Sequence, residues 1–246
     1  MNGKSSLTST FLVGDPDMGL YQLVSPEVTH GNIDIAKAHE LAQQSPMWAA
    51  RGQAIQAYAI LEQELCHLFR LTSKVSKEAA AIVFYKITNY RARNDILEKL
   101  IKETHGNKYS LFWNSFFNYL RTADLTRNEL IHWLSAVNVA KNQFGQTMIG
   151  VNLVSPQSLP KKERGELRTL NDVNAFIEKC IIMSAICTQF NLRQARPDLS
   201  DFFEKAGKDD PWQSIFLQEL VYPLPSDHPL FRTSDKLETQ PPPSPG

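Results

Sequence analysis

The sequence predicts an all-α protein, an up-and-down four-helix bundle with a β-hairpin inserted before the last helix. Apolar residues recur at helical spacing over 46–71, after Ser76 to about 104, over 109–134 and over 169–192. Between 135 and 154, alternating β-branched residues surround a glycine-containing turn, which is typical of a hairpin. Capping and helix-ending residues lie at the borders of these segments.

The N-terminal part divides into an arm and the start of the bundle. Residues 1–32 have Gly, Pro, Asp and Ser around short apolar pieces, so we expect an irregular arm that can include a short strand. A short amphipathic helix is predicted from Ile33 to about Gln44. Ser45 and Pro46 then fit a cap followed by the first helical residue of the next helix. The bundle as a whole is expected to span 33–196.

The two central helices have clear ends. The helix that begins after Ser76 should stop at about Thr104, because Gly106 can adopt the left-handed conformation that closes a helix. The next helix, at about 109–134, is rich in aromatic side chains. At helical spacing such side chains are far more often core than ligand-binding. We therefore expect the following to be buried: Trp113, Phe116, Phe117 and Tyr119.

A capping box opens the last helix. Thr169 and Asp172 have the spacing at which each side chain bonds the other residue's backbone N–H. The helix should run to about Leu192. After it, residues 197–238 are expected to form a C-terminal extension of short helical pieces that packs on the bundle. The Pro-rich residues 239–246 are expected to be disordered.

Composition narrows the class of protein. The 246 residues are 42% hydrophobic, enough to bury one sizeable core. Lys+Arg and Asp+Glu both number 26, and this neutral total excludes broad, sequence-blind coating of nucleic acid while allowing a local basic site. No apolar run approaches a membrane span and no signal peptide is visible, so a cytoplasmic protein without membrane contact is expected. Cys66, Cys180 and Cys187 have no metal-ligand spacing, which predicts buried thiols and no metal or other cofactor.

Charged residues occupy apolar helix faces. On a helical wheel centred on Phe116, Arg127 falls at about 20°, inside the apolar sector, and Asp124 lies near its edge. A buried guanidinium must be paired, and Asp124, one turn earlier, could contact it. Glu62 and Asn94 lie on the apolar stripes of the two preceding helices, and Arg91 and Arg93 flank the stripe that contains Asn94. Three interpretations stay open: a structural network, a functional site, or surface charges on a bent helix.

His132 faces another direction. It falls at about 160° on the same wheel, beside Arg121, Leu125 and Asn128, and Asn128 is one turn before it. It is about 140° from Arg127, so one straight helix cannot direct both side chains to one point. If two chains paired along this edge, their histidines would converge. Self-association would also explain the outward Leu125, and Trp133, off the apolar stripe, is a candidate for stacking or dimer contact.

The segment RNELIH, residues 127–132, resembles the RNxxxH signature of the HEPN superfamily. The resemblance covers about residues 46–194 and includes AYAILEQELCHLF and ITNYRARNDILEKLI. It implies a dimeric helical bundle in which the motifs of both chains line one composite cleft. Many such proteins are metal-independent endoribonucleases that act as toxins or in antiphage and stress defence. Others have lost catalysis and serve as binding modules.

The resemblance implies roles for these residues. His132 would be the general acid or base, Arg127 would stabilise charge on the phosphorane, and Asn128 would orient the imidazole or the phosphate. Glu62 would hold Arg127, with the other inward polar groups around it: Asp124, Arg91, Arg93 and Asn94. The residues expected to contact substrate or a second subunit are Arg121, Leu125 and Trp133.

The implied partners are a second copy of the chain, an RNA substrate and an antitoxin or regulatory protein. Two alternatives remain. One is a catalytically inactive bundle of the same type that binds a partner protein or a nucleotide. The other is a structural scaffold in which residues 197–220 lie across the motif.

Overall fold

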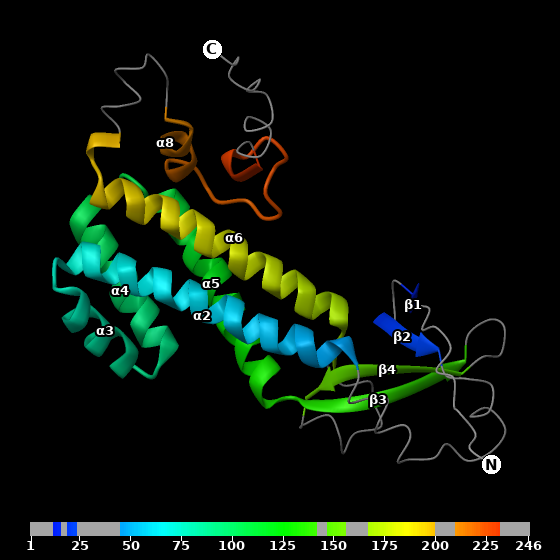
Figure 1. The fold of residues 1–246 in the computed structure, drawn as a ribbon. Helices are drawn as coiled ribbons and strands as arrows, with labels where there is room; N and C mark the ends of the chain where they lie inside the picture. The colour runs from blue at the N-terminus through cyan, green and yellow to red at the C-terminus, as the bar shows by residue number, and fades with distance from the viewer. Residues whose placement is uncertain are drawn as a thin grey trace, which may run out of the picture. The chain divides into compact units, whose positions relative to one another are not determined.

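The computed structural model describes residues 12–15, 19–23, 45–141, 147–155, 167–199 and 210–231. Chain contacts divide the protein into two compact units. The first contains the described residues of Met1–Tyr58 and Leu125–Lys179, and the second those of Ala59–Asp124 and Cys180–Gly246. Three helices contribute a segment to both units (Figure 1): α2 (Pro46–Ser73), α5 (Ser110–His132) and α6 (Leu170–Ala195).

The first unit contains an antiparallel sheet in the order β1-β2-β4-β3 (Figure 1). A fifth strand, β5, also pairs with β4. The strands β3 (Leu134–Lys141) and β4 (Thr147–Val154) pair from Leu134↔Val154 to Lys141↔Thr147, which confirms the predicted hairpin. Because β3 occupies one edge of β4 along its length, β2 and β5 share the other edge. The remaining strands are β1 (Leu12–Asp15), β2 (Gly19–Leu23) and β5 (Leu167–Arg168).

This sheet makes the all-α prediction too narrow: the protein is mostly helical with a small antiparallel sheet. The arm contributes two strands rather than one, since β1 pairs with β2, and β2 pairs with β4 at Gln22↔Ile149. The short apolar pieces of the arm are weak strand signals by themselves. Their extended form depends on pairing of β2 with β4, which is more than a hundred residues away in the chain, and this partner cannot be inferred from local sequence.

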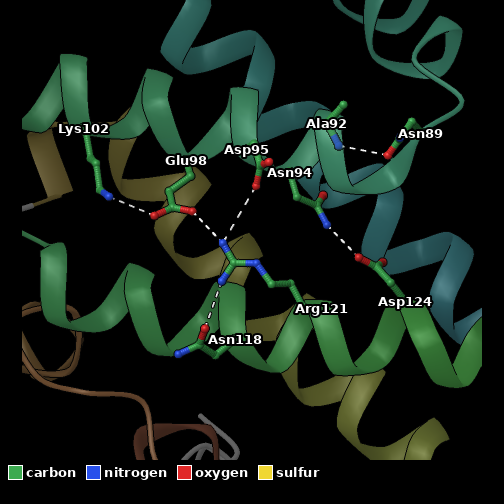
Figure 2. Close-up of polar contacts among 9 residues, drawn as sticks. All are labelled: Asn89, Ala92, Asn94, Asp95, Glu98, Lys102, Asn118, Arg121 and Asp124. Carbon is green, nitrogen blue, oxygen red and sulfur yellow. Dashed lines mark hydrogen bonds and ion pairs between the residues drawn. The ribbon is translucent and has the colours of Figure 1, made fainter.

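The second unit contains two helices where one was predicted from Ser76 to Thr104. They are α3 (Lys77–Lys86) and α4 (Tyr90–His105). Ser76 caps the first, and Asn89 caps the second by accepting a hydrogen bond from the Ala92 N–H at 3.1 Å (Figure 2). Asn competes for backbone donors and favours the N-cap position, so a new helix starts after it. Gly106, at φ 59°, ends α4 as predicted.

The predicted capping box is confirmed at the start of α6. The Thr169 N–H donates to Asp172 Oδ2 at 2.7 Å, and the Asp172 N–H donates to Thr169 Oγ1 at 3.3 Å. The helix ends at Ala195, three residues beyond the predicted end. The predicted helix from Ile33 to Gln44 and the tail 239–246 lie outside the described residues.

An aromatic core fills the second unit. The side chains of Trp113, Phe116 and Phe117 are at most 2% exposed, as predicted, whereas Tyr119 is only half-buried. Two further elements belong here, α8 (Pro211–Phe216) and the short helix η3 (Pro229–Phe231). The C-terminal segment joins the core where the Phe216 ring lies 5.1 Å from Phe112 and the Leu220 N–H donates to Ser115 Oγ at 2.8 Å.

The three cysteines are free and buried, as predicted. Among the described helices, α6 has the length and mean hydropathy of a membrane span. One face of it is buried against protein in the second unit, including Cys180, Met183, Ile186, Cys187 and Phe190. We therefore interpret α6 as a core helix.

Candidate functional site

The motif residues lie on the last turns of α5, in the first unit. Arg51 of α2 holds this helix end. Its guanidinium donates to the carbonyls of Leu130, Ile131 and Trp133, at 2.8 Å for Ile131 and 3.4 Å for Trp133. The last carbonyls of a helix lack partners within the helix, and a cation there also interacts favourably with the helix dipole. Burial lowers the pKa of Arg51 from its usual value. The position of His132, the last residue of α5, is thereby fixed.

Arg127 is half-buried, whereas the helical wheel predicted that its side chain would be enclosed in the core. Its guanidinium carbon lies 5.8 Å from the centroid of the Tyr58 ring, and its Nη1 donates to Asn128 Oδ1 at 3.2 Å. An aromatic face and an amide oxygen are both neutral partners. Because the group remains partly hydrated, it does not require a carboxylate. Its positive charge is therefore not compensated by these contacts.

The carboxylates expected to pair with Arg127 have other partners. Glu62 forms a hydrogen-bonded ion pair with Arg93, which corrects the predicted Glu62–Arg127 contact. Asp124, 1% exposed, accepts a hydrogen bond from Asn94 Nδ2 at 2.8 Å (Figure 2). Asn94 and Arg93 are 2% and 7% exposed; Asn94 donates to the buried Asp124, and Arg93 donates to the half-buried Glu62. Arg91, on the same helix, is exposed.

These contacts favour the structural interpretation of the inward polar groups. Within the second unit, the Glu62–Arg93 pair joins α2 to α4, and the Asn94–Asp124 pair joins α4 to α5. Arg93 also lies 4.6 Å from the centroid of the Phe84 ring in α3. Buried polar groups that pair across helices can set helix register without taking part in chemistry. We assign Glu62, Arg93, Asn94 and Asp124 this structural role.

Arg121 is likewise engaged in the second unit. Its Nη2 donates to Glu98 Oε2 at 3.0 Å and lies 3.9 Å from Asp95 Oδ1, and its Nη1 donates to Asn118 Oδ1 at 2.9 Å (Figure 2). The charge of this arginine is therefore balanced by two carboxylates of α4. The structure gives Arg121 a helix-joining role where a substrate or dimer contact was predicted.

His132 is exposed at the end of α5. In the part of the chain that the structure describes, its imidazole has no hydrogen-bond or ion-pair partner, and the predicted contact with Asn128 is not formed. The amide oxygen of Asn128 is used by Arg127 instead. Both ring nitrogens of His132 are thus available to a substrate or to another chain.

Trp133 is 9% exposed, so the predicted stacking or dimer contact is wrong for this side chain. Arg168 of β5 covers it, with the guanidinium carbon 5.7 Å from the ring centroid. Arg168 also forms an ion pair with Glu129, with an Nη2–Oε2 distance of 2.7 Å. The pairing of β5 with β4 holds Arg168 here, and no local signal in the sequence indicates that contact.

Two exposed leucines lie beside the motif along the chain. Leu125 is 58% exposed, on the outward side that the wheel predicted, and Leu134 is 50% exposed at the start of β3. Exposed leucines are common singly, but these two are within nine residues of each other and of the exposed His132. They make this end of α5 a candidate contact surface.

Sequence reasoning missed Arg51, Tyr58 and Arg168. One signal was available: no glycine follows His132, and β3 begins at Leu134. A helix that ends without a glycine cap needs other donors for its last carbonyls. That argument predicts that some donor exists, but it does not select Arg51.

Comparison of the chain with family models, curated proteins and solved structures gives no match.

Proposed function

We propose that this protein is a metal-independent endoribonuclease of HEPN type, active as a homodimer with a composite site. One observation carries the proposal. Arg127, which contacts the neutral Tyr58 and Asn128, and His132, whose imidazole is exposed, lie five residues apart on a helix end held by Arg51. An uncompensated guanidinium and an accessible imidazole are the two groups that RNA transesterification needs most.

In the proposed reaction, the 2′-hydroxyl oxygen of RNA attacks the adjacent phosphorus, and the bond from phosphorus to the 5′-oxygen breaks. The products are a 2′,3′-cyclic phosphate and a free 5′-hydroxyl. His132 takes the 2′-hydroxyl proton or gives a proton to the leaving 5′-oxygen, because imidazole titrates near neutral pH. Arg127 donates hydrogen bonds to the phosphorane, and Asn128 positions its guanidinium through Oδ1.

Two copies are needed because Arg127 and His132 project about 140° apart around α5. In a two-fold dimer, the histidine of one chain could face the arginine of the other. Leu125, 58% exposed, would lie in such an interface. We place the enzyme in the cytoplasm, as a toxin or defence ribonuclease held in check by an antitoxin or regulatory protein.

The test is incubation of the purified protein with RNA in excess EDTA, followed by analysis of the fragment ends. Wild type should release fragments with 2′,3′-cyclic phosphates, and His132→Ala should lower the rate by at least about a hundredfold. His67→Ala is the matched control, since His67 lies elsewhere on α2, where its imidazole is 3.8 Å from Glu64. Equal cleavage by wild type and His132→Ala would refute the assignment.

The second candidate is an inactive bundle that binds a partner protein. The exposed Leu125 and Leu134 favour it, because they suit an apolar contact. An RNA-inactive wild type whose partner binding is abolished by Leu125→Glu would support this candidate over the nuclease.

A further inference from the structure

The second unit contains a cavity of about 460 Å³, within the size range of small-molecule sites. It lies where the end of α4, the turn before α5, the end of α6 and α8 meet. None of its lining residues belongs to the RNxxxH motif. The side chains that line it include His105, Lys108, Tyr109, Phe190, Gln194 and Gln213.

One side of the cavity is aromatic. The rings of His105, Tyr109 and Phe190 contact one another edge to face, with centroid distances of 5.3–5.8 Å. Phe190 is 1% exposed and forms the back of this wall, while His105 and Tyr109 are half-buried. Planar rings pack favourably against such surfaces in offset or edge-to-face geometry.

One positive charge at the cavity is uncompensated. Lys108 Nζ lies 5.0 Å from the Tyr109 ring centroid, and among the described residues it has no carboxylate partner. The other cation, Arg193, is bound by both carboxylate oxygens of Asp210, at 2.7 and 2.8 Å. The cavity therefore carries one net ammonium charge from its lining residues, which matches a monoanion.

The side-chain amides of the half-buried Gln194 and the exposed Gln213 also line the cavity and, within the described chain, make no hydrogen bond, so both are open to a ligand. His105 Nε2 is buried and also without a hydrogen-bond partner. Burial and the nearby Lys108 lower the pKa of His105, which favours the neutral form of this imidazole. A ligand bearing hydrogen-bonding groups would satisfy these donors and acceptors.

We propose that this cavity binds a small aromatic carboxylate, with its ring against Tyr109 and Phe190 and its carboxylate at Lys108. A carboxylate is favoured over a phosphate because a phosphate dianion would exceed the single uncompensated charge. The amides of Gln194 and Gln213 would hydrogen-bond polar substituents of the ligand. This site is independent of the proposed ribonuclease activity.

The test compares a carboxylate with its neutral amide on the full chain. Isothermal titration with indole-3-acetate and indole-3-acetamide should show about tenfold tighter binding of the acid, the size expected for a charge-assisted contact. Lys108→Gln should abolish that preference. The control Lys99→Gln, an exposed lysine of α4 outside the cavity, should keep it. Lys108 is exposed, so its substitution should leave the thermal unfolding midpoint unchanged.

Four results would overturn the proposal, the last of them its carboxylate assignment. The first is equal affinity of wild type for the acid and the amide, and the second is an unchanged preference in Lys108→Gln. The third is absence of binding of both probes at millimolar concentration. A nucleoside monophosphate that binds more tightly than the acid would overturn the carboxylate assignment. RNA cleavage by Lys108→Gln should equal that of wild type, which separates this proposal from the nuclease.

Discussion

The guanidinium of Arg51 donates a hydrogen bond to the carbonyl of Ile131, 2.8 Å away, one residue before His132. The same group reaches the carbonyls of Leu130 and Trp133. A residue near the start of α2 thus terminates the helix that carries the motif. The first half of α2 and the last turns of α5 belong to one compact unit, joined by this contact and by the Tyr58–Arg127 pair.

Replacement of Arg51 should loosen the end of α5. In Arg51→Met, three carbonyls lose their donor, and we expect the free energy of unfolding to fall by about 2 kcal/mol. Any RNA cleavage should fall as well, because His132 is no longer held. Urea unfolding measures the first effect. Arg91→Met is the control, since this exposed arginine of α4 should change stability by less than about 0.5 kcal/mol. An equal loss of unfolding free energy in Arg51→Met and Arg91→Met would contradict the proposal that Arg51 stabilises the end of α5.

The Glu62–Arg93 pair should behave as a buried ion pair. Glu62→Met leaves Arg93, 7% exposed, without its carboxylate, and we expect the free energy of unfolding to fall by about 3 kcal/mol. The double variant Glu62→Met with Arg93→Met should recover most of that loss, because both charges are removed. Denaturant unfolding of the four proteins of this double-mutant cycle measures the coupling. Additive effects of the two substitutions would show that the pair contributes no coupling.

Substitution of the exposed Leu125 tests whether the protein self-associates. Sedimentation should give a dimer for wild type at micromolar concentration and a monomer for Leu125→Glu, because the charge would have to be desolvated in the interface. The matched control is Leu111→Glu, on the same helix and 61% exposed but in the second unit. It should remain dimeric. A monomeric wild type, or dissociation by both substitutions, would argue against an interface at Leu125.

His105 should make stability depend on pH. Its folded-state pKa lies below the unfolded value of 6.5, first because of burial and then because of Lys108. The unfolded chain therefore binds more protons than the folded one as pH falls below about 6.5, and stability decreases toward acid. His228 is shifted in the same direction by burial, against a smaller opposite effect of Asp227. His105→Asn should reduce the slope of the unfolding free energy between pH 7 and 5; an unchanged slope would refute the assignment.

Local patterns were sufficient for much of the fold. The Thr169–Asp172 capping box, the stop at Gly106 and the hairpin from Leu134 to Val154 all involve residues close in sequence. Their physical causes, which are backbone donors to be satisfied, a positive φ and alternation along a strand, act over a few residues. For the same reason the sequence alone indicated the motif and the outward direction of Leu125 and His132 on α5.

The tertiary structure determined which side chains these charged residues contact. The wheel placed Glu62 and Arg127 on inward faces, but it could not show that Glu62 binds Arg93 or that Arg127 lies on Tyr58. It also could not show that Arg168 covers Trp133, since that contact needs β5 to pair with β4. A charged side chain on an apolar helix face needs a hydrogen-bonding or oppositely charged partner when it is buried. Which partner it finds depends on which distant segments are adjacent, and that is determined by packing of the whole chain.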